Sequence, residues 1–131
     1  MKTKIFPIEE VNEITGQIVD SAIEVHRVLG PGLLESVYEA CLVREISNRG
    51  LKFERQFPVA VVYKNEKLDI GFRIDLFVGN CVVVELKVVE EILPIHEAQI
   101  LTYLKLTGNR VGLILNFNVR WMKNGIQRII L

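Results

Sequence analysis

The sequence predicts an α/β fold in which helices cover the faces of a mixed β-sheet, with the elements in the order ααβββαββ. The hydrophobic pattern supports this order. Apolar residues recur at spacings of three and four before position 50, as in amphipathic helices, and alternate between positions 57 and 87, as in strands. The chain has 131 residues, 50% hydrophobic and 24% charged, so we expect one domain over residues 1–131 with one core.

Two helices are predicted in the first 50 residues. The stripe of the first helix consists of Val11, Ile14, Ile18, Ala22, Val25 and Leu29. Gly30-Pro31-Gly32 ends it, because proline lacks an amide donor and the glycines permit a sharp turn. The second helix runs from about Leu33 to Arg49, with Gly50 as its cap. Its buried side is expected to hold Leu34, Val37, Cys41 and Leu42.

Three strands follow. The first contains the alternating segment from Phe57 to Tyr63, and it closes at a polar turn over residues 64–67. The second runs from about Leu68 to Val78, and Gly79-Asn80 is a hairpin signal. The third, from Cys81 to Lys87, is rich in the valines that suit a central strand.

A third helix and two further strands complete the order. Pro94 is well placed for the first turn of a helix, which runs to about Thr107 with Gly108 as its cap. The segments from Val111 to Phe117 and from Ile126 to Leu131 are predicted strands.

Composition excludes several protein classes. Cys41 and Cys81 are too few for a secreted disulfide scaffold and lack metal-ligand spacing. The first ten residues contain Pro7 and two glutamates where a signal peptide needs an apolar segment. No window approaches the ~20 apolar residues that span a bilayer. We therefore expect a cytoplasmic protein with no membrane partner.

The formal net charge is zero, but the charges are distributed unevenly. All 16 acidic residues lie at or before Glu97, together with 11 of the 16 basic residues. The five later basic residues are Lys105, Arg110, Arg120, Lys123 and Arg128. They could face a polyanion or form ordinary solvated surface.

Three charged residues stand in the most hydrophobic part of the sequence. Alternation along the second strand places Ile74, Leu76 and Val78 on one face and Arg73, Asp75 and Phe77 on the other. The third strand likewise directs Val82, Val84 and Leu86 to the core and Cys81, Val83, Glu85 and Lys87 to the opposite face. Burying Asp75, Glu85 and Lys87 there costs free energy unless they are paired or bind something, and such conflicts often mark functional sites.

This trio suits metal-assisted phosphodiester hydrolysis. Two neighbouring carboxylates supply the hard oxygen ligands that Mg²⁺ prefers. The ammonium of Lys87 can orient or help deprotonate the attacking water and offset negative charge in the transition state. The alternative is a solvent-facing edge where Asp75, Glu85 and Lys87 form surface ion pairs.

Two helices carry further polar clusters, which are Gly32, Glu35 and Tyr38 on the second and His96, Gln99 and Tyr103 on the third. Glu35 lies in a first turn, where the helix dipole alone would favour a negative charge. Gln99 could hydrogen-bond a phosphate or a metal-bound water, although a plain helix–sheet interface would show the same spacing.

The segment Gly32-Leu33-Leu34-Glu35-Ser36-Val37-Tyr38 resembles the signature of the GxxExxY proteins, a small bacterial and archaeal family in the PD-(D/E)XK nuclease superfamily. The resemblance covers nearly the whole chain and includes residues 25–32, 71–75, 84–87, 96–103 and 112–118. It implies a restriction-endonuclease-like core, with Asp75 as the first acid and Glu85 and Lys87 as the (D/E)XK pair. Ile74 replaces the proline of the motif's name, a variation that the superfamily tolerates.

The resemblance also implies a ligand set and an activity. Glu35 would complete the metal shell, and Gln99 would be the polar residue of the helix after the third strand. The Mg²⁺ or Mn²⁺ ion would be held by Glu35, Asp75, Glu85 and the Leu86 carbonyl. We expect an endonuclease-like hydrolase acting on DNA, or else RNA, with target choice depending on a homodimer or another protein. The alternative is a catalytically silent nucleic-acid-binding or protein-interaction module on the same fold.

The proposed chemistry makes two geometric predictions. A strict two-residue hairpin at Gly79-Asn80 would put Asp75 and Glu85 on opposite faces, so a three-residue loop or a bulge is expected near Gly79. The helix that carries Glu35 should lie against the open end of that hairpin. At least one of the three acids should then have a raised pKa without metal.

Overall fold

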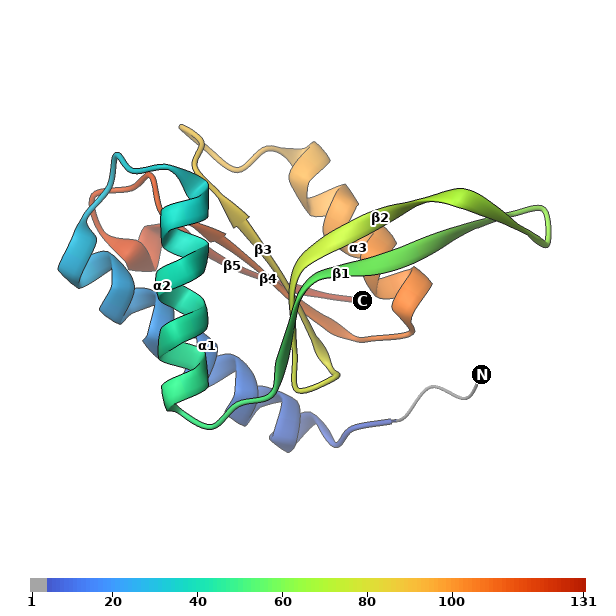
Figure 1. Cartoon of the computed structure of the whole chain (residues 1–131), viewed down its shortest axis with the longest axis horizontal. Helices are drawn as coiled ribbons and strands as arrows, with labels where there is room; N and C mark the ends of the chain where they lie inside the picture. The colour runs from blue at the N-terminus through green and yellow to red at the C-terminus, as the bar shows by residue number, and fades with distance from the viewer. Residues whose placement is uncertain (1–4) are drawn as a thin grey trace.

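The computed structural model describes residues 5–131 of the chain (Figure 1). The elements are α1 (Ile8–Leu29), α2 (Glu35–Asn48), β1 (Phe53–Tyr63), β2 (Glu66–Val78), β3 (Val82–Lys87), α3 (Pro94–Thr107), β4 (Val111–Asn116), the 3₁₀ helix η1 (Met122–Asn124) and β5 (Ile126–Ile130). The expected order ααβββαββ is confirmed, and η1 is an addition to it. Residues 1–4, which the expected domain includes, lie outside the described residues.

The five strands form one mixed sheet in the order β1-β2-β3-β4-β5. Neighbouring strands are antiparallel except β3 and β4, which are parallel and are connected through α3. Helices α1 and α2 cover one face of the sheet and α3 covers the other (Figure 1). No helix within residues 5–131 combines the length and hydropathy needed to cross a membrane.

Each face of the sheet has its own core. Strands β3 and β4 contribute alternate residues to the two cores, as their period of two requires. The sheet residues under α1 and α2 include Leu76, Val78, Val82, Val84, Leu86, Leu113 and Leu115. Those under α3 include Ile74, Phe77, Val83 and Ile114. The central strands are therefore buried on both sides.

The buried face of α2 differs from the one expected. Its fully buried residues are Tyr38, Leu42 and Ile46, whereas Leu34 is 73% exposed, Val37 is exposed and Cys41 is half-buried. Tyr38 decides the orientation, because its ring stacks on Phe117 with centroids 4.6 Å apart. Its hydroxyl donates to the Gly30 carbonyl at 2.6 Å. The expectation that Leu34 and Val37 face the core is wrong because a buried tyrosine with satisfied polar atoms competes successfully with aliphatic residues.

Strand β2 pairs with β3 only from Leu76 to Val78, and its earlier part forms with β1 an extended hairpin that passes across α3 (Figure 1). The bend carries Ile74 to the α3 side, so its expected position with Leu76 and Val78 is wrong. In β1 the bend coincides with Gln56, whose φ of 49° is left-handed. The expected outward position of Cys81 is also wrong. Cys81 is buried under α1 because it belongs to the loop before β3 rather than to the strand.

Candidate active site

The loop between β2 and β3 consists of the three residues Gly79, Asn80 and Cys81. Val78 pairs with Val82 and Leu76 with Val84, which places Asp75 directly across from Glu85. Left-handed backbone at Gly79 and Asn80, with φ of 61° and 57°, makes this connection possible. The predicted three-residue loop is confirmed, and the two carboxylates lie across from each other in adjacent strands.

Asp75 and Glu85 stand where the β2–β3 ladder ends, and their side chains replace the missing backbone bonds. The Asp75 N–H donates to Glu85 Oε1 at 3.2 Å. The Leu86 N–H donates to Asp75 Oδ2 at 2.9 Å. Each carboxylate is thus held by an N–H from the opposite strand, which fixes the pair on the rigid part of the sheet.

Glu85 is buried, with 7% of its surface exposed. Burial and the nearby charge of Asp75 raise the pKa of Glu85 from 4.5 to about 8, although the Asp75 N–H and Lys87 oppose the rise. Burial, together with the charges of Glu85 and Asp75, also raises the pKa of Tyr103. Without a cation, the protein therefore favours the protonated form of Glu85 at neutral pH.

Lys87 is half-buried at the end of β3. Its positive charge opposes the rise in the pKa of both Glu85 and Glu35, so Lys87 interacts electrostatically with both acids. Within residues 5–131 it forms no salt bridge with Asp75 or Glu85. Because Glu85 is buried and Lys87 is unpaired, the alternative of surface ion pairs among the trio is wrong.

Glu35 is the first residue of α2, and its side chain is largely exposed. Partial desolvation and the charge of Asp75 raise its pKa, while Lys87 lowers it. The predicted raised pKa is thus found for both Glu35 and Glu85. However, no three Asp, Glu, His or Cys side chains in the described part of the chain stand close enough to hold an ion. The charge of Glu35 therefore interacts with Asp75 and Lys87, but Glu35 does not form a preformed three-carboxylate metal site with Asp75 and Glu85.

Gln99 lies on α3 one turn before Tyr103, and its side chain is exposed. The i,i+4 spacing puts both residues on the same side of the helix, since residues four apart are neighbours on a helical surface. Leu86 lies in β3 between Glu85 and Lys87, and its N–H is bound by Asp75. Both residues therefore lie on elements that border the carboxylate pair.

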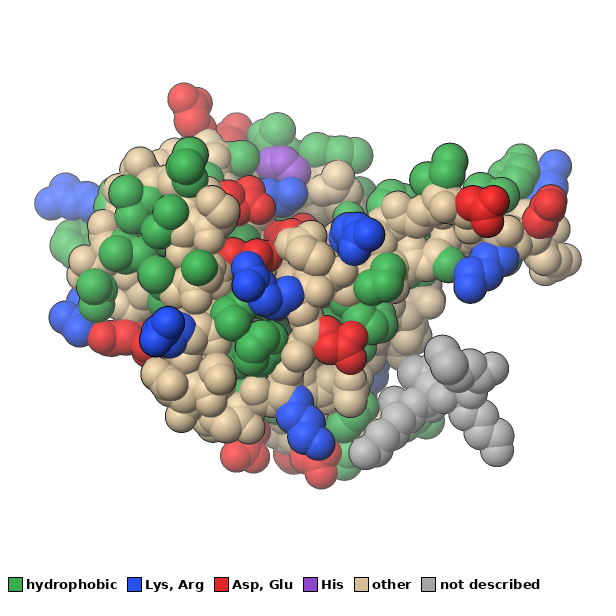
Figure 2. All heavy atoms as spheres, viewed as in Figure 1, with side chains coloured by type: hydrophobic (Ala, Val, Ile, Leu, Met, Phe, Trp, Pro, Cys, Tyr) green, Lys and Arg blue, Asp and Glu red, His purple; other side chains and the backbone are tan. Residues whose placement is uncertain are grey.

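Sequence reasoning missed a second row of polar residues behind Asp75. The Gln56 side-chain amide donates to Glu39 at 2.9 Å and to Asp75 Oδ1 at 3.4 Å. Glu39 also forms a 2.9 Å salt bridge with Arg55. Glu39 follows Glu35 by one turn of α2, which was the available signal, whereas nothing in the sequence places Gln56 beside Asp75. Figure 2 shows acidic and basic side chains gathered between α2 and the base of the hairpin.

Asn116 fixes the loop that follows Lys87. It is 2% exposed, and its side chain accepts from the Val89 N–H at 3.1 Å and donates to the Val89 carbonyl at 2.9 Å. The Lys87 carbonyl accepts from the Phe117 N–H at 3.0 Å. Hydrogen bonds at Lys87 and at Val89 therefore join the end of β3 and the loop after it to the end of β4.

The donors at this site suit a divalent cation. Asp75 and Glu85 present two hard carboxylate groups, and their mutual repulsion, visible in the raised pKa of Glu85, would fall when a cation neutralises them. Mg²⁺ is commonly bound by one or two carboxylates, with water and substrate phosphate completing its shell. The pair fits that ion without a third preformed ligand.

Comparison with protein families matches residues 12–129 to the model of the PD-(D/E)XK nuclease superfamily. Nucleases of this superfamily generally use divalent metals and act on nucleic acid. Comparisons with curated proteins and with solved structures gave no significant match.

Proposed function

Because the chain belongs to the PD-(D/E)XK nuclease superfamily, we propose that it hydrolyses phosphodiester bonds of DNA, or less readily of RNA, with Mg²⁺ or Mn²⁺. One observation carries this proposal. Asp75 and Glu85 lie across from each other where the pairing of β2 and β3 ends. Glu85 is buried there, and burial and Asp75 raise its pKa. A buried carboxylate that destabilises the metal-free protein is the expected signature of a site arranged for a cation.

The proposed roles follow from chemistry and position. The ion would be held by Asp75, Glu85 and the Leu86 carbonyl, and Glu35 would complete its shell by moving toward them, because the three carboxylates are too far apart to hold an ion as they stand. When bound, such an ion polarises the phosphoryl oxygen and makes water a better nucleophile. Lys87 would orient that water and stabilise negative charge in the transition state. Gln99 would position the water or the scissile phosphate.

The residues of the chain also set the protonation state of the site. Glu85 retains its proton at neutral pH without a cation, so it must release this proton to act as a ligand. The positive charge of Lys87 favours the ionised form of both Glu85 and Glu35. Cleavage at a fixed metal concentration should therefore increase as pH rises toward 8.

We further assign the chain to the GxxExxY proteins. The Gly32-to-Tyr38 segment supports this assignment through distinct tasks of its named residues. Gly32 takes a φ of 96°, which favours glycine. Glu35 opens α2 beside Asp75, and Tyr38 holds the preceding turn through its hydroxyl bonds to Gly30 and Leu33.

The proposal is tested by cleavage and metal binding together. End-labelled single-stranded, double-stranded and branched DNA, and RNA, are incubated with the protein in Mg²⁺, in Mn²⁺ and in EDTA. Isothermal titration calorimetry measures metal affinity for the wild type, for Asp75→Asn and for Asp69→Asn. Asp69 is a matched control, because it is an exposed aspartate on the same strand.

We expect metal-dependent cleavage by the wild type and by Asp69→Asn. Asp75→Asn should lose metal affinity and cleavage together, because the substitution removes a charged ligand while keeping the side-chain shape. Failure of the wild type to cleave any substrate with either ion would contradict the proposal. Nucleic-acid binding without cleavage would make the silent binding module the better account.

A further inference from the structure

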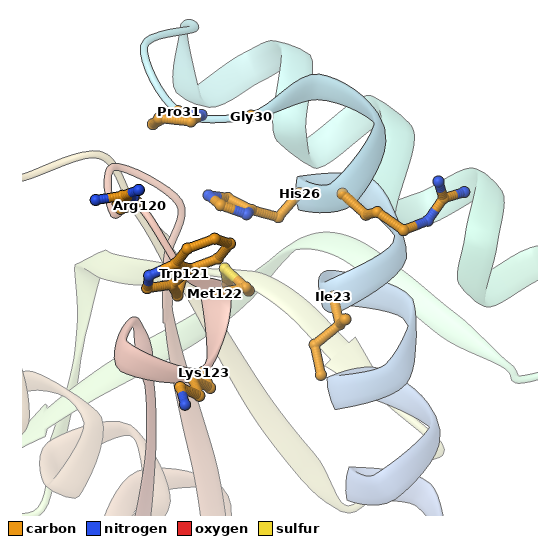
Figure 3. A pocket seen from close by; sticks show the side chains of 9 residues that line it. Ile23, His26, Gly30, Pro31, Arg120, Trp121, Met122 and Lys123 are labelled. Carbon is orange, nitrogen blue, oxygen red and sulfur yellow. The ribbon is translucent and has the colours of Figure 1, made fainter.

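A second concave surface lies where the end of α1 meets the segment between β4 and β5. It is a pocket of ≈ 670 Å³ lined by Ile23, His26, Arg27, Gly30, Pro31, Arg120, Trp121, Met122 and Lys123. Figure 3 shows His26 pointing from α1 toward the segment that carries Arg120 and Trp121, with Met122 beside the tryptophan. None of these residues belongs to the carboxylate site, and we call this surface the Trp121 pocket.

The Trp121 pocket combines an aromatic platform with positive charge. Trp121 is 57% exposed, and the Arg120 guanidinium lies 5.1 Å from its ring centroid. The lining contains no acidic residue. Arg27 is neutralised by Glu24 at 2.6 Å, whereas Arg120 and Lys123 form no salt bridge within residues 5–131. Arg120 and Lys123 are among the five basic residues that follow Glu97, the last acidic residue of the chain.

The platform is held rigidly by bonds that do not involve the tryptophan ring. The buried His26 donates from Nε2 to the Val119 carbonyl at 2.7 Å, which ties the segment to α1. The Trp121 carbonyl accepts from the Asn124 N–H at 2.9 Å, and Asn116 N–H donates to the Gly125 carbonyl at 2.8 Å. A preformed surface loses little conformational entropy when it binds a ligand. The exposure of Trp121 is therefore not the result of a loose loop.

Chain connectivity places the pocket near the carboxylates. Asn116, the last residue of β4, pairs with Lys87. Trp121 follows Asn116 by five residues, which span at most about 18 Å. On the other rim, Pro31 precedes Glu35 by four residues, which span at most about 14 Å. A nucleic-acid strand that crosses the carboxylates can reach the Trp121 pocket within a few nucleotides.

We propose that the Trp121 pocket is a nucleobase-binding subsite that stacks an unpaired base of the substrate strand on Trp121, while Arg120 and Lys123 contact its phosphates. This inference rests on the proposed nuclease function and assigns it a substrate feature, an unpaired nucleotide close to the cleaved bond. Stacking suits any base, because every base has a π-face, and exposed cations beside the ring supply the backbone contacts. Ile23 and Met122 provide the apolar part of the wall.

Binding is measured in EDTA, so that the readout does not depend on metal or cleavage. Trp121 is the only tryptophan of the chain, and its fluorescence therefore reports on this pocket alone. The probes are an eight-nucleotide oligothymidylate and an abasic oligonucleotide of equal length and charge. Fluorescence anisotropy of the labelled oligothymidylate gives affinities for Trp121→Ala, Trp121→Phe and Lys123→Ala.

A matched control exists at the far end of the hairpin. Tyr63 is 61% exposed, and the Lys64 ammonium lies 5.4 Å from its ring centroid, which reproduces the aromatic–cation pair outside the pocket. Tyr63→Ala should leave affinity unchanged. Circular dichroism melts of all variants establish that each is folded under the conditions of the titration.

Oligothymidylate should quench Trp121 fluorescence, and the abasic strand should quench it much less. Trp121→Ala should weaken oligothymidylate binding roughly ten- to hundred-fold, and Trp121→Phe should restore much of the affinity. Lys123→Ala should reduce the salt slope of log K by about 0.7, the value for one phosphate contact on a single strand. Loss in Trp121→Ala with retention in Tyr63→Ala supports the subsite.

Three results would overturn it: equal affinities of wild type and Trp121→Ala, equal quenching by the abasic strand, or no binding of either probe. These results are distinguishable from failure of the nuclease proposal. A wild type that cleaves with Mg²⁺ while Trp121→Ala binds normally refutes only the subsite. A wild type that shows base-dependent quenching but never cleaves refutes only the nuclease.

Discussion

Replacing Glu85 by glutamine should stabilise the metal-free protein, and the gain should depend on pH. In the unfolded chain this carboxyl ionises near its ordinary pKa of 4.5, whereas in the native protein burial and Asp75 raise the pKa to about 8. The native state therefore holds the proton more tightly, and stability falls as pH rises from 4.5 through 8. Glutamine cannot ionise, and its side-chain oxygen can still accept from the Asp75 N–H.

The magnitude follows from the size of the pKa change. A rise from 4.5 to about 8 corresponds to at most about 5 kcal/mol, at about 1.4 kcal/mol per tenfold change in proton affinity. Structural relaxation around the ionised pair reduces this figure, so we expect Glu85→Gln to be more stable by about 2–4 kcal/mol at pH 9. Near pH 5 the two proteins should differ by less than about 1 kcal/mol.

Urea unfolding in EDTA at intervals from pH 5 to pH 9 measures this difference. Glu91→Gln is the control, because Glu91 is exposed and its replacement should have no pH-dependent effect. Mg²⁺ at pH 8 should then raise the melting temperature of the wild type and leave Glu85→Gln unchanged, since only the wild type keeps both ligands. A stability difference that stays constant across the pH range would refute the reasoning about Glu85.

Three further variants test separate parts of the structure. Lys87→Ala should lower the cleavage rate about 10²-fold or more while leaving the calorimetric metal affinity nearly unchanged, because the lysine is assigned to the transition state. Tyr38→Phe should lower the urea-derived unfolding free energy by about 1–3 kcal/mol, since it leaves the Gly30 carbonyl without its 2.6 Å donor. Asn116→Ala should cost about 2–3 kcal/mol in the same measurement and accelerate amide hydrogen exchange at Val89, whose N–H it binds.

The elements with chemical signals at both ends were predicted most accurately. Helix α3 was expected from Pro94 to about Thr107, and the structure has those bounds. Proline fixed the start because its missing donor is harmless in a first turn, and Gly108 fixed the end by adopting a left-handed φ of 71°. Where such signals are weaker the ends moved, as in β1, which begins at Phe53 rather than near Phe57.

Errors arose where tertiary packing overrides a local pattern. The pattern of apolar residues placed Leu34 and Val37 in the core. In the structure α2 instead directs Tyr38 into the core, where its hydroxyl is hydrogen-bonded and its ring is stacked, and this orientation leaves Leu34 and Val37 exposed. Strict alternation placed Ile74 beside Leu76, but that rule describes a flat strand, and β2 bends toward α3 between these residues. Neither effect is visible without the partner elements.

The carboxylate pair was predictable because it is a conflict within the sequence. A glutamate amid the valines of β3 demands a reason, and a shared cation then required the loop that the structure has. Gln56 carried no such signal. It reaches Asp75 because β1 bends at that residue, and its left-handed φ of 49° is a property of the folded sheet.

The parallel pairing of β3 and β4 connects the two sites. Parallel strands end at the same edge of a sheet, so the segments after Lys87 and Asn116 start side by side. The Asn116 side chain hydrogen-bonds Val89 in the segment after Lys87. The Asn116 backbone N–H donates to the Gly125 carbonyl at the end of the other segment. Asn116→Ala should therefore disturb the position of Lys87 first and the Trp121 pocket less, because the backbone bond to Gly125 survives the substitution. Oligothymidylate affinity retained alongside reduced cleavage in this variant would show that the two sites share a frame but are separable in function.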